Sequence, residues 1–300
     1  MGAQRSTLEI ANHSFSLANP LQRVLPRLAG RPFNLTAAVG RFVWMMTGSN
    51  RLDDIQYYDP RALRFSDDGY SIPGSSDGAR LLNPRPGLNQ LERVIDLLVS
   101  DESTRRAVAV IYHPEDAGRR SKDVPCHIGV AYNVRSGALN GTTIMRSCNA
   151  ARVLPYDLFL FTLLFEIVSK SIGRSLGAYH QFTVSMHVYL DEVSASDIAD
   201  LDNSAVPPMP SMPDEDPMPR LRELAKAERE IRNFFAGGTS AQDAIEYGTG
   251  LGEALGGYWS SFALVLLTHA ARRSSGRTGV AEELTAFARD RIFPAFKACL

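Results

Sequence analysis

The chain has 300 residues, of which 32 are Lys or Arg and 33 are Asp or Glu, so its formal net charge is −1 at pH 7. Its hydrophobic fraction of 44% is ordinary for a globular protein and is compatible with one large core. Without a basic excess, binding to polymeric nucleic acid is not expected, although a ligand with one phosphate needs only a local group of arginines.

Cysteine usage and hydropathy predict a soluble cytoplasmic protein without a metal site. Cys126, Cys148 and Cys299 are odd in number and form no C-x-x-C pair, which argues against a disulfide framework or a zinc site. Residues 1–8 lack the apolar stretch of a signal peptide. The longest apolar run, 158–168, is shorter than the ~20 residues that span a bilayer, so no membrane contact is expected.

Apolar periodicity predicts the elements of the first half of the chain. In order, they are a helix at 34–47 that ends at Gly48, a loop at 57–78, a helix at 88–99, a strand at 107–112, and strands at 128–134 and 139–145 joined through R-S-G-A. The last two strands are expected to form a hairpin.

The second half is predicted to contain the central helix of the core. Pro155 stands where a first helical turn tolerates proline, and the segment LFLFTLLFEIVSK that follows is apolar on nearly all sides. The remaining predicted elements are a strand at 181–190, a Pro/Met-rich loop at 203–219, and helices at 220–235 and 258–273 separated by Gly-rich turns.

A group of motifs with fixed spacing accompanies these elements. The segment DVPCHIGVAYNVRSGALNGTTIMRSCNAARVLPYD contains P-C-H, R-S-C and P-Y-D; STRRAVAVIYH precedes it and HVY follows it. These motifs resemble the thymidylate synthase superfamily over roughly residues 30–192 and are closest in pattern to the cytidylate (CMP/dCMP) hydroxymethylases of nucleoside-antibiotic pathways and phages. The resemblance implies an α/β (α+β) core at 1–202 with a thymidylate-synthase-like mixed sheet and packed helices, followed by a divergent helical region at 220–300 that packs on it.

Cys126 is the candidate catalytic nucleophile. A lone cysteine is most often a small buried apolar residue, which is our interpretation of Cys148 and Cys299. Cys126, by contrast, follows Pro125 at a loop-to-strand junction and precedes His127, and several arginines are expected nearby. Because a cationic surrounding lowers the pKa of a thiol, we expect a usable thiolate at neutral pH.

The arginines of these motifs are candidate phosphate ligands, because a guanidinium binds phosphate through two parallel hydrogen bonds. The resemblance implies that the arginine pair before the strand at 107–112 reaches the phosphate of a neighbouring subunit, which requires a homodimer with shared active sites. The R-S-C-N motif would bind the nucleotide of its own chain. The candidates are Arg105 and Arg106 for the neighbouring site, Arg146, Ser147 and Asn149 for the same chain, and Arg5 as a weaker candidate.

Asp157 is the candidate reader of the base and a candidate catalytic residue. Thymidylate synthases have an asparagine here, which can donate to O4 of uracil, whereas an ionised carboxylate only accepts hydrogen bonds. Asp157 therefore favours a cytosine base and would stabilise its N3-protonated adduct, although a charge that simply suits a helix N-terminus is the alternative. His187 and Tyr189 lie two apart on a strand, face one side, and match the pair that holds a ribose hydroxyl.

The donor side of the family pattern is altered. The catalytic glutamate falls at Arg41, the loop tyrosine expected at 75–78 is missing, and Val153 stands for a glycine beside the folate ring. The two tryptophans that face folate map to Tyr58 and Arg61. Replacing a carboxylate by arginine reverses a local charge and removes a general base. We therefore predict an intact nucleotide half and a remodelled donor and proton-transfer half.

Taken with these residues, the resemblance implies a one-carbon transferase that hydroxymethylates CMP or dCMP, with 5,10-methylenetetrahydrofolate as the donor. Cys126 would add to C6 of the base and activate C5 toward the donor, and water would complete the hydroxymethyl group. Two alternatives stay open. Arg41, Val153 and Asn149 are compatible with folate-independent chemistry at C5 or C6, and the missing glutamate is compatible with a non-catalytic nucleotide-binding paralogue.

Overall fold

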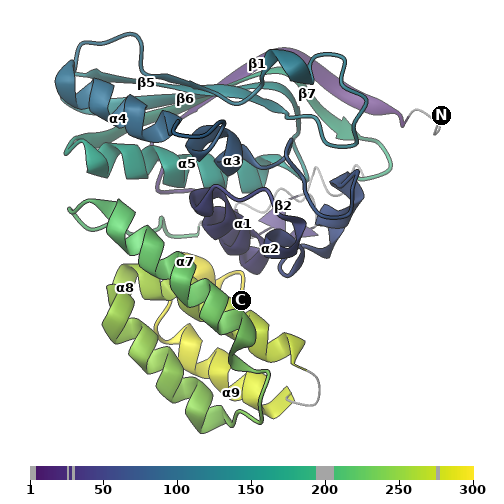
Figure 1. Ribbon diagram of the computed structural model, residues 1–300, viewed down its shortest axis with the longest axis vertical. Coiled ribbons are helices and arrows are strands. Elements are labelled where there is room, and N and C mark those ends of the chain that lie inside the picture. Colours follow the sequence, from purple (N-terminus) through teal and green to yellow (C-terminus); the bar gives the residue numbers. More distant parts are fainter. Residues whose placement is uncertain (1–4, 26, 29–30, 194–205, 275–277) are drawn as a thin grey trace.

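The architecture is a five-stranded mixed sheet with helices packed against it (Figure 1), as the sequence predicts. The computed structural model describes residues 5–25, 27–28, 31–193, 206–274 and 278–300. The strand order is β1-β7-β6-β5-β4, and only β6 and β7 run parallel. The strands are β1 Thr7–Leu17, β4 Val108–Val110, β5 His127–Arg135, β6 Ala138–Asn149 and β7 Ser175–Tyr189, with a separate pair of β2 Arg27–Leu28 and β3 Arg31–Pro32.

Helices make up much of the remaining described chain. Between the strands lie α1 Leu35–Thr47, α2 Leu52–Gln56, the 3₁₀ helix η1 Pro60–Phe65, α3 Asp77–Leu82, α4 Gln90–Ser100, the 3₁₀ helix η2 Pro114–Asp116 and α5 Leu154–Ser171. The C-terminal region contains α7 Pro217–Phe234, α8 Ala241–Arg273, α9 Thr278–Arg289 and α10 Pro294–Lys297. Within the described ranges, no helix combines the length and the hydrophobicity that crossing a bilayer requires.

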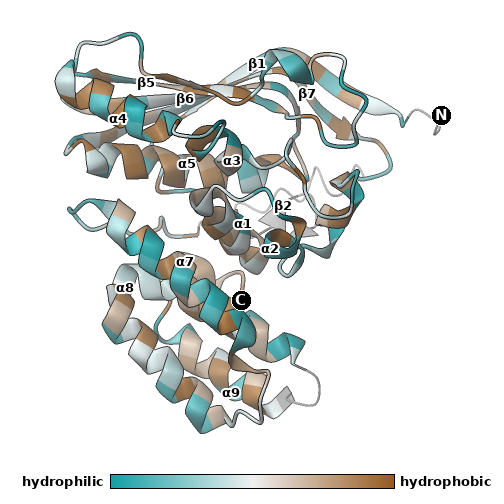
Figure 2. Cartoon of the chain, viewed as in Figure 1, coloured by the Kyte–Doolittle hydropathy of each residue, from teal (hydrophilic) through white to brown (hydrophobic). Residues whose placement is uncertain are grey.

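The centre of the fold is the unit β5-β6-α5-β7. The predicted hairpin joins β5 to β6 through Ser136 and Gly137, whose φ angles of 53° and 76° are typical of a two-residue hairpin turn. Helix α5 begins with Pro155 in its first turn and is buried along most of its length, as its continuous hydrophobicity predicts. Figure 2 shows hydrophobic residues along α5 and along the strands above it. The helix is the crossover that lets β7 return parallel to β6.

The C-terminal helices extend the same core. Phe42 of α1 contacts Phe262 of α8 with ring centroids 5.6 Å apart, and Phe159 of α5 contacts Phe296 of α10 at 6.2 Å. These contacts belong to one continuous buried cluster. The division of the chain into a core at 1–202 and a region at 220–300 stays a prediction, and residue 202 lies outside the described residues.

Two parts of the sequence prediction are wrong in the C-terminal and central regions. The residues before 258 were expected to form Gly-rich turns, but α8 begins at Ala241, because Ser240 and Asp243 form a capping box at its start. The helix is broken only at Gly256, which has a φ of 73°. The predicted loop at 57–78 also contains η1 and the start of α3.

One face of the sheet is not covered by helices of the described chain. Helices α3, α4 and α5 all lie on the other side (Figure 1). The uncovered face carries apolar side chains, among them Val108 and Val110 of β4 and Val184 of β7, which are 51%, 44% and 44% exposed. Exposed apolar side chains on a sheet face without a helical cover are compatible with an interface.

Helix α3 lies so close to α1 that it requires a glycine at Gly78. A Cβ atom at this position would lie 1.9 Å from the carbonyl oxygen of Met45. We therefore expect Gly78→Ala to lower the free energy of unfolding by about 1–3 kcal/mol through overpacking. Gly250 in α8 has no heavy atom within 4 Å of its Cβ position, so Gly250→Ala should raise it by about 0.5–1 kcal/mol. Urea denaturation of both variants tests the pair, and equal effects would contradict the close approach.

Candidate active site

Cys126 lies immediately before β5, and Arg146 of β6 holds the loop that carries it. The Arg146 guanidinium donates from Nε to the carbonyl oxygen of Pro125 at 2.7 Å and from Nη2 to that of Val124 at 3.1 Å. The same Nη2 lies 3.8 Å from the Cys126 Sγ. Nη1 has no hydrogen-bond partner among the described residues, so it is available for an anion. The structure thus brings the predicted nucleophile and one predicted phosphate ligand together.

The expectation that the pKa of Cys126 is lowered is wrong for this protein. Burial of the thiol raises its pKa above the ordinary value, and the nearby charges of Arg146 and His127 offset this only in part. The carboxylates of Asp157 and Asp77 act in the opposite direction and raise the pKa further. The sequence indicated the cations but not the two carboxylates or the depth of the site.

His127, which sequence reasoning treated only as a neighbour of the cysteine, lies between two carboxylates. Its Nδ1 is 3.1 Å from Oδ1 of Asp77 in α3, and its Nε2 is 3.6 Å from Oδ2 of Asp157 in α5. The ring packs on Phe161 with centroids 4.2 Å apart. Burial alone would lower the His127 pKa, but the two carboxylates outweigh it and raise the pKa well above its ordinary value. The ring is therefore an imidazolium at neutral pH.

Asp157 occupies the first turn of α5 and is 6% exposed. Its Oδ2 lies 3.8 Å from the Sγ of Cys148, which is buried beside Met145 and Met186. Cys148 is buried, as the sequence predicts, and burial raises the pKa of its thiol. The predicted base reader thus lies in the group of side chains around Cys126, although its contact with His127 was not foreseen.

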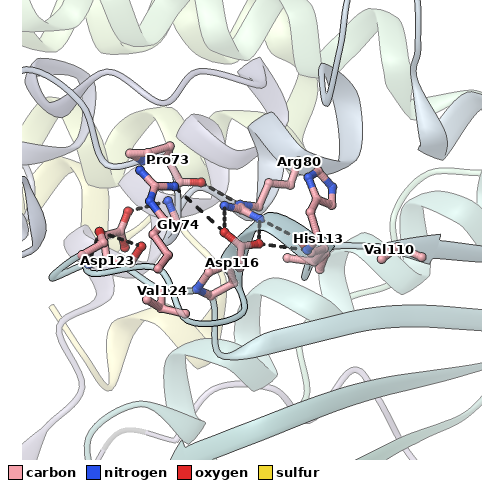
Figure 3. Close-up of polar contacts among 12 residues, drawn as sticks. Pro73, Gly74, Arg80, Val110, His113, Asp116, Asp123 and Val124 are labelled. Carbon is pink, nitrogen blue, oxygen red and sulfur yellow. Dashed lines mark hydrogen bonds and ion pairs between the residues drawn. The ribbon is translucent and has the colours of Figure 1, made fainter.

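The helix that carries Asp77 is fixed to the loop before Cys126 by a network of polar contacts (Figure 3). Arg80 of α3 donates to both carboxylate oxygens of Asp116, at 2.5 and 2.9 Å, and to the carbonyl oxygen of Pro73 at 2.7 Å. Burial would raise the pKa of Asp116, but Arg80 lowers it below the ordinary value. Asp123 accepts from the backbone N–H of Gly74. The start of α3, which carries Asp77, and the loop before β5 are therefore held in place.

The predicted ribose pair lies on one side of β7. The His187 and Tyr189 rings are edge to face with centroids 5.2 Å apart, and Ser147 Oγ is 3.4 Å from His187 Nδ1. Arg5 stacks on Tyr189 at 3.8 Å from the ring centroid, and its guanidinium also donates to Asp191. Binding of a nucleotide by these residues stays a prediction.

Asn149 and the arginine pair are placed differently from the other candidates. The Asn149 side chain accepts from the backbone N–H groups of Ala151 and Arg152, at 3.0 and 2.8 Å, and donates to Glu192 at 3.0 Å. The amide oxygen and one amide hydrogen are thus used within the chain, and a nucleotide could accept from the second amide hydrogen without breaking these bonds. Arg105 and Arg106 precede β4. They lie in the exposed bend before β4, and their side chains have no partner in the described part of the chain.

A cavity of about 510 Å³ lies beside the first turn of α5. Within its wall, Asp59 accepts hydrogen bonds from Arg41 and from Arg61, both at 2.9 Å. Burial would raise the pKa of Asp59, but the two guanidiniums lower it to about 2. The lining residues are Leu25, Pro32, Phe33, Asn34, Tyr58, Asp59, Pro60, Arg61, Ala151, Arg152, Pro155 and Tyr156. The cavity is thus lined by Tyr58 and Arg61, two positions that the family resemblance assigned to the donor side.

The chain belongs to the thymidylate synthase family, whose family model matches residues 4–212. It is similar to the deoxyuridylate hydroxymethyltransferase of Bacillus phage SP01, with 30% identity over 207 residues, which are 64% of this chain and 53% of that protein. It is also similar to the deoxyuridylate hydroxymethyltransferase of Delftia phage PhiW-14, with 31% identity over 196 residues, which are 60% of this chain and 52% of that protein. The chain thus spans about half the length of these curated relatives.

Solved structures confirm the fold. Thymidylate synthase A from Bacillus subtilis matches with a TM-score of 0.57 and 20% identity, covering 70% of this chain and 76% of that one. Thymidylate synthase from T4 phage matches with a TM-score of 0.58 and 18% identity, covering 73% and 83%.

The raised pKa of Cys126 predicts slow alkylation at neutral pH and a rate that rises with pH beyond the range of an ordinary thiol, because only the thiolate reacts. Arg146→Gln should slow alkylation about tenfold at pH 8, the effect of one pKa unit. Arg146→Lys keeps the charge and should lie closer to the native rate. Iodoacetamide labelling with mass spectrometry of the Cys126 peptide measures both. A native rate that is flat from pH 6 to 9 would contradict the buried neutral thiol.

Proposed function

We propose that this protein is a one-carbon transferase that hydroxymethylates C5 of a pyrimidine nucleoside monophosphate through a covalent adduct at Cys126. The observation that carries this proposal is the grouping of Cys126, Arg146 and Asp157, which come from a loop, a strand and a helix. In one buried site, the thiol can add to the base, the guanidinium can bind the phosphate, and the carboxylate can select the base by hydrogen bonding. Family membership and the names of the two phage relatives support the reaction class.

In this proposal, each group has a defined task. The Cys126 thiolate forms a bond to C6 of the base, which moves the ring electrons toward C5 and makes this carbon nucleophilic. Arg146 stabilises the thiolate and directs Nη1 to the phosphate. The proposed ribose contacts are His187 and Tyr189. The imidazolium of His127 orients Asp157, because a buried carboxylate is stabilised by a fixed opposite charge.

The one-carbon donor that we propose is 5,10-methylenetetrahydrofolate, which supplies a carbon at the oxidation level of formaldehyde. The cavity of about 510 Å³ fits such a donor, because Phe33 and Tyr156 form an aromatic wall, with ring centroids 4.9 Å apart. Arg61 and Arg152 on the same wall suit an anionic tail.

The proposed assembly is a homodimer in which Arg105 and Arg106 serve the phosphate of the neighbouring site. Two observations support it. The uncovered sheet face with Val108, Val110 and Val184 provides an apolar surface. The two arginines lie in an exposed bend beside the edge strand β4, so they are available to a second subunit.

The proposed base is cytosine, and Asp157 is the residue that tests it. An ionised carboxylate has no proton for O4 of uracil, and a mispaired buried contact costs ~1–3 kcal/mol, so CMP or dCMP should bind roughly ten- to a hundredfold more tightly than UMP or dUMP. Asp157→Asn should shift the preference toward uracil, the base of the relatives' deoxyuridylate. Calorimetric titration at pH 7 measures the four affinities.

Asp77→Asn is the matched control for this experiment. It removes the other carboxylate from His127 without changing the group that faces the base, so the preference for cytosine should persist. If the native protein binds UMP as tightly as CMP, Asp157 does not select the base.

Incubation with 5,10-methylenetetrahydrofolate and mass spectrometry of each nucleotide then identifies the substrate. The hydroxymethylase is excluded if no nucleotide gains mass while an active control enzyme does.

The shared site predicts complementation between two inactive variants. Cys126→Ala and Arg106→Ala chains, mixed and allowed to exchange subunits, should recover about a quarter of the native activity, because half of the dimers are hybrids with one intact site each. Cys126→Ala mixed with Asp157→Ala is the control, since both changes affect residues of the same chain's site and no hybrid site is intact. A monomer by light scattering at micromolar concentration would contradict the dimer.

A further inference from the structure

The segment from Tyr57 to Arg61 forms one wall of the cavity proposed for the donor, and it is held by helices that lie far away in the sequence. Tyr58, Asp59 and Arg61 line the cavity. The segment is not rigid by itself, since Asp59 and Arg61 stand at the start of the short 3₁₀ helix η1. Its position must therefore be determined by the elements that pack against it.

Helix α1 supports the segment from one side. A Cβ atom at Gly40 would lie 2.4 Å from Cγ of Tyr58, so the tyrosine ring packs directly on the helix backbone. The next residue, Arg41, binds Asp59 at 2.9 Å. This contact fixes Asp59, but it does not position the hydroxyl group of Tyr58.

Glu228 of α7 holds the hydroxyl end of Tyr58. The Tyr58 Oη donates to Oε1 of Glu228 at 2.6 Å, and both side chains are buried, at 3% and 5% exposed. Arg232, one turn further along α7, binds Glu228 at 2.8 Å and Asp54 at 3.4 Å. Burial raises the pKa of Glu228, while Tyr58 and Arg232 oppose this by stabilising its charge. Arg232 thus contacts both carboxylate oxygens of Glu228, and the Tyr58 hydroxyl donates to one of them, Oε1.

Helix α8 holds the preceding residue. His269 Nε2 is 3.1 Å from the carbonyl oxygen of Tyr57, and Arg273 donates to the same oxygen at 3.2 Å. The Arg273 guanidinium also stacks on the Tyr57 ring at 4.6 Å. Burial lowers the pKa of His269, so the ring is neutral and donates through a protonated Nε2. Two helices therefore fix both the backbone and the side chains at the start of the wall.

The contacts from α7 and α8 come from residues beyond 212, where the match to the family model ends. We propose that Glu228, with His269 in support, is a positioning residue for the one-carbon donor: through Tyr58 it sets the shape of the donor cavity without touching the nucleotide. The C-terminal helical region thus acts as part of the donor site. This inference rests on the proposed function, because it assigns the cavity to the donor.

Variants of Glu228 test the proposal through a difference between the two substrates. Glu228→Ala leaves the Tyr58 hydroxyl without its partner, so KM for 5,10-methylenetetrahydrofolate should rise roughly tenfold while KM for the nucleotide changes less than about twofold. Glu228→Gln keeps an oxygen acceptor and should restore most of the native value. Tyr58→Phe should match Glu228→Ala, and the double variant should be no worse than either single variant.

Binding of tetrahydrofolate to the nucleotide-bound protein, measured by calorimetry, gives a readout that is independent of turnover. It should weaken by the same factor as KM rises. Glu230→Ala, an exposed position on the same helix, is the matched control and should have no effect. Equal loss of affinity for nucleotide and donor, or unchanged donor affinity in Glu228→Ala, would overturn the inference alone. A native protein that neither binds tetrahydrofolate nor turns over would instead contradict the proposed function.

Discussion

The candidate site depends on one buried imidazolium, that of His127, which lies between carboxylates from the first turns of α3 and α5. A buried charge is costly unless it is paired, so the ring and its two partners stabilise one another only when both helices are in place. Because the pKa of His127 is raised on folding, its contribution to stability is complete below the unfolded value of about 6.5 and is lost only as pH rises through the higher folded value. The arrangement therefore persists at neutral pH.

The polar network around Arg80 follows from this constraint. His127 and Asp77 can meet only if the loop before β5 and the loop before α3 hold fixed positions, and these are the two segments that Arg80, Asp116 and Asp123 join. On the opposite side, Arg146 fixes the same loop before β5 through backbone carbonyl oxygens. Cys126, the proposed nucleophile, is thus positioned by two guanidinium groups: Arg146 binds main-chain carbonyl oxygens, and Arg80 binds a main-chain carbonyl oxygen and the Asp116 carboxylate.

Sequence reasoning predicted the sheet, the hairpin and the central helix because each has a local signal, such as R-S-G-A for the turn or Pro155 before a continuous apolar run. It also placed Cys126, Arg146 and Asp157 in one site through the resemblance of their motifs. It missed what depends on long-range packing. The contact of His127 with Asp77 has no local pattern, and neither has the capped start of α8 within a glycine-rich stretch. The thiol pKa was misjudged for the same reason, since burial is a property of the folded chain.

In the structure, the positive charge of Arg41 is paired with a nearby carboxylate. The arginine stands where the family has a catalytic glutamate, but it binds Asp59, so a carboxylate is still present in the cavity wall. Asp59 does not replace the lost general base, however, because a group with a pKa of about 2 takes up almost no protons at neutral pH. With Arg61 as the second partner, the cluster has two positive charges and one negative charge. Its net positive charge favours an anion where the family pattern has an acidic residue, which is the physical sense in which the proposed donor half is remodelled.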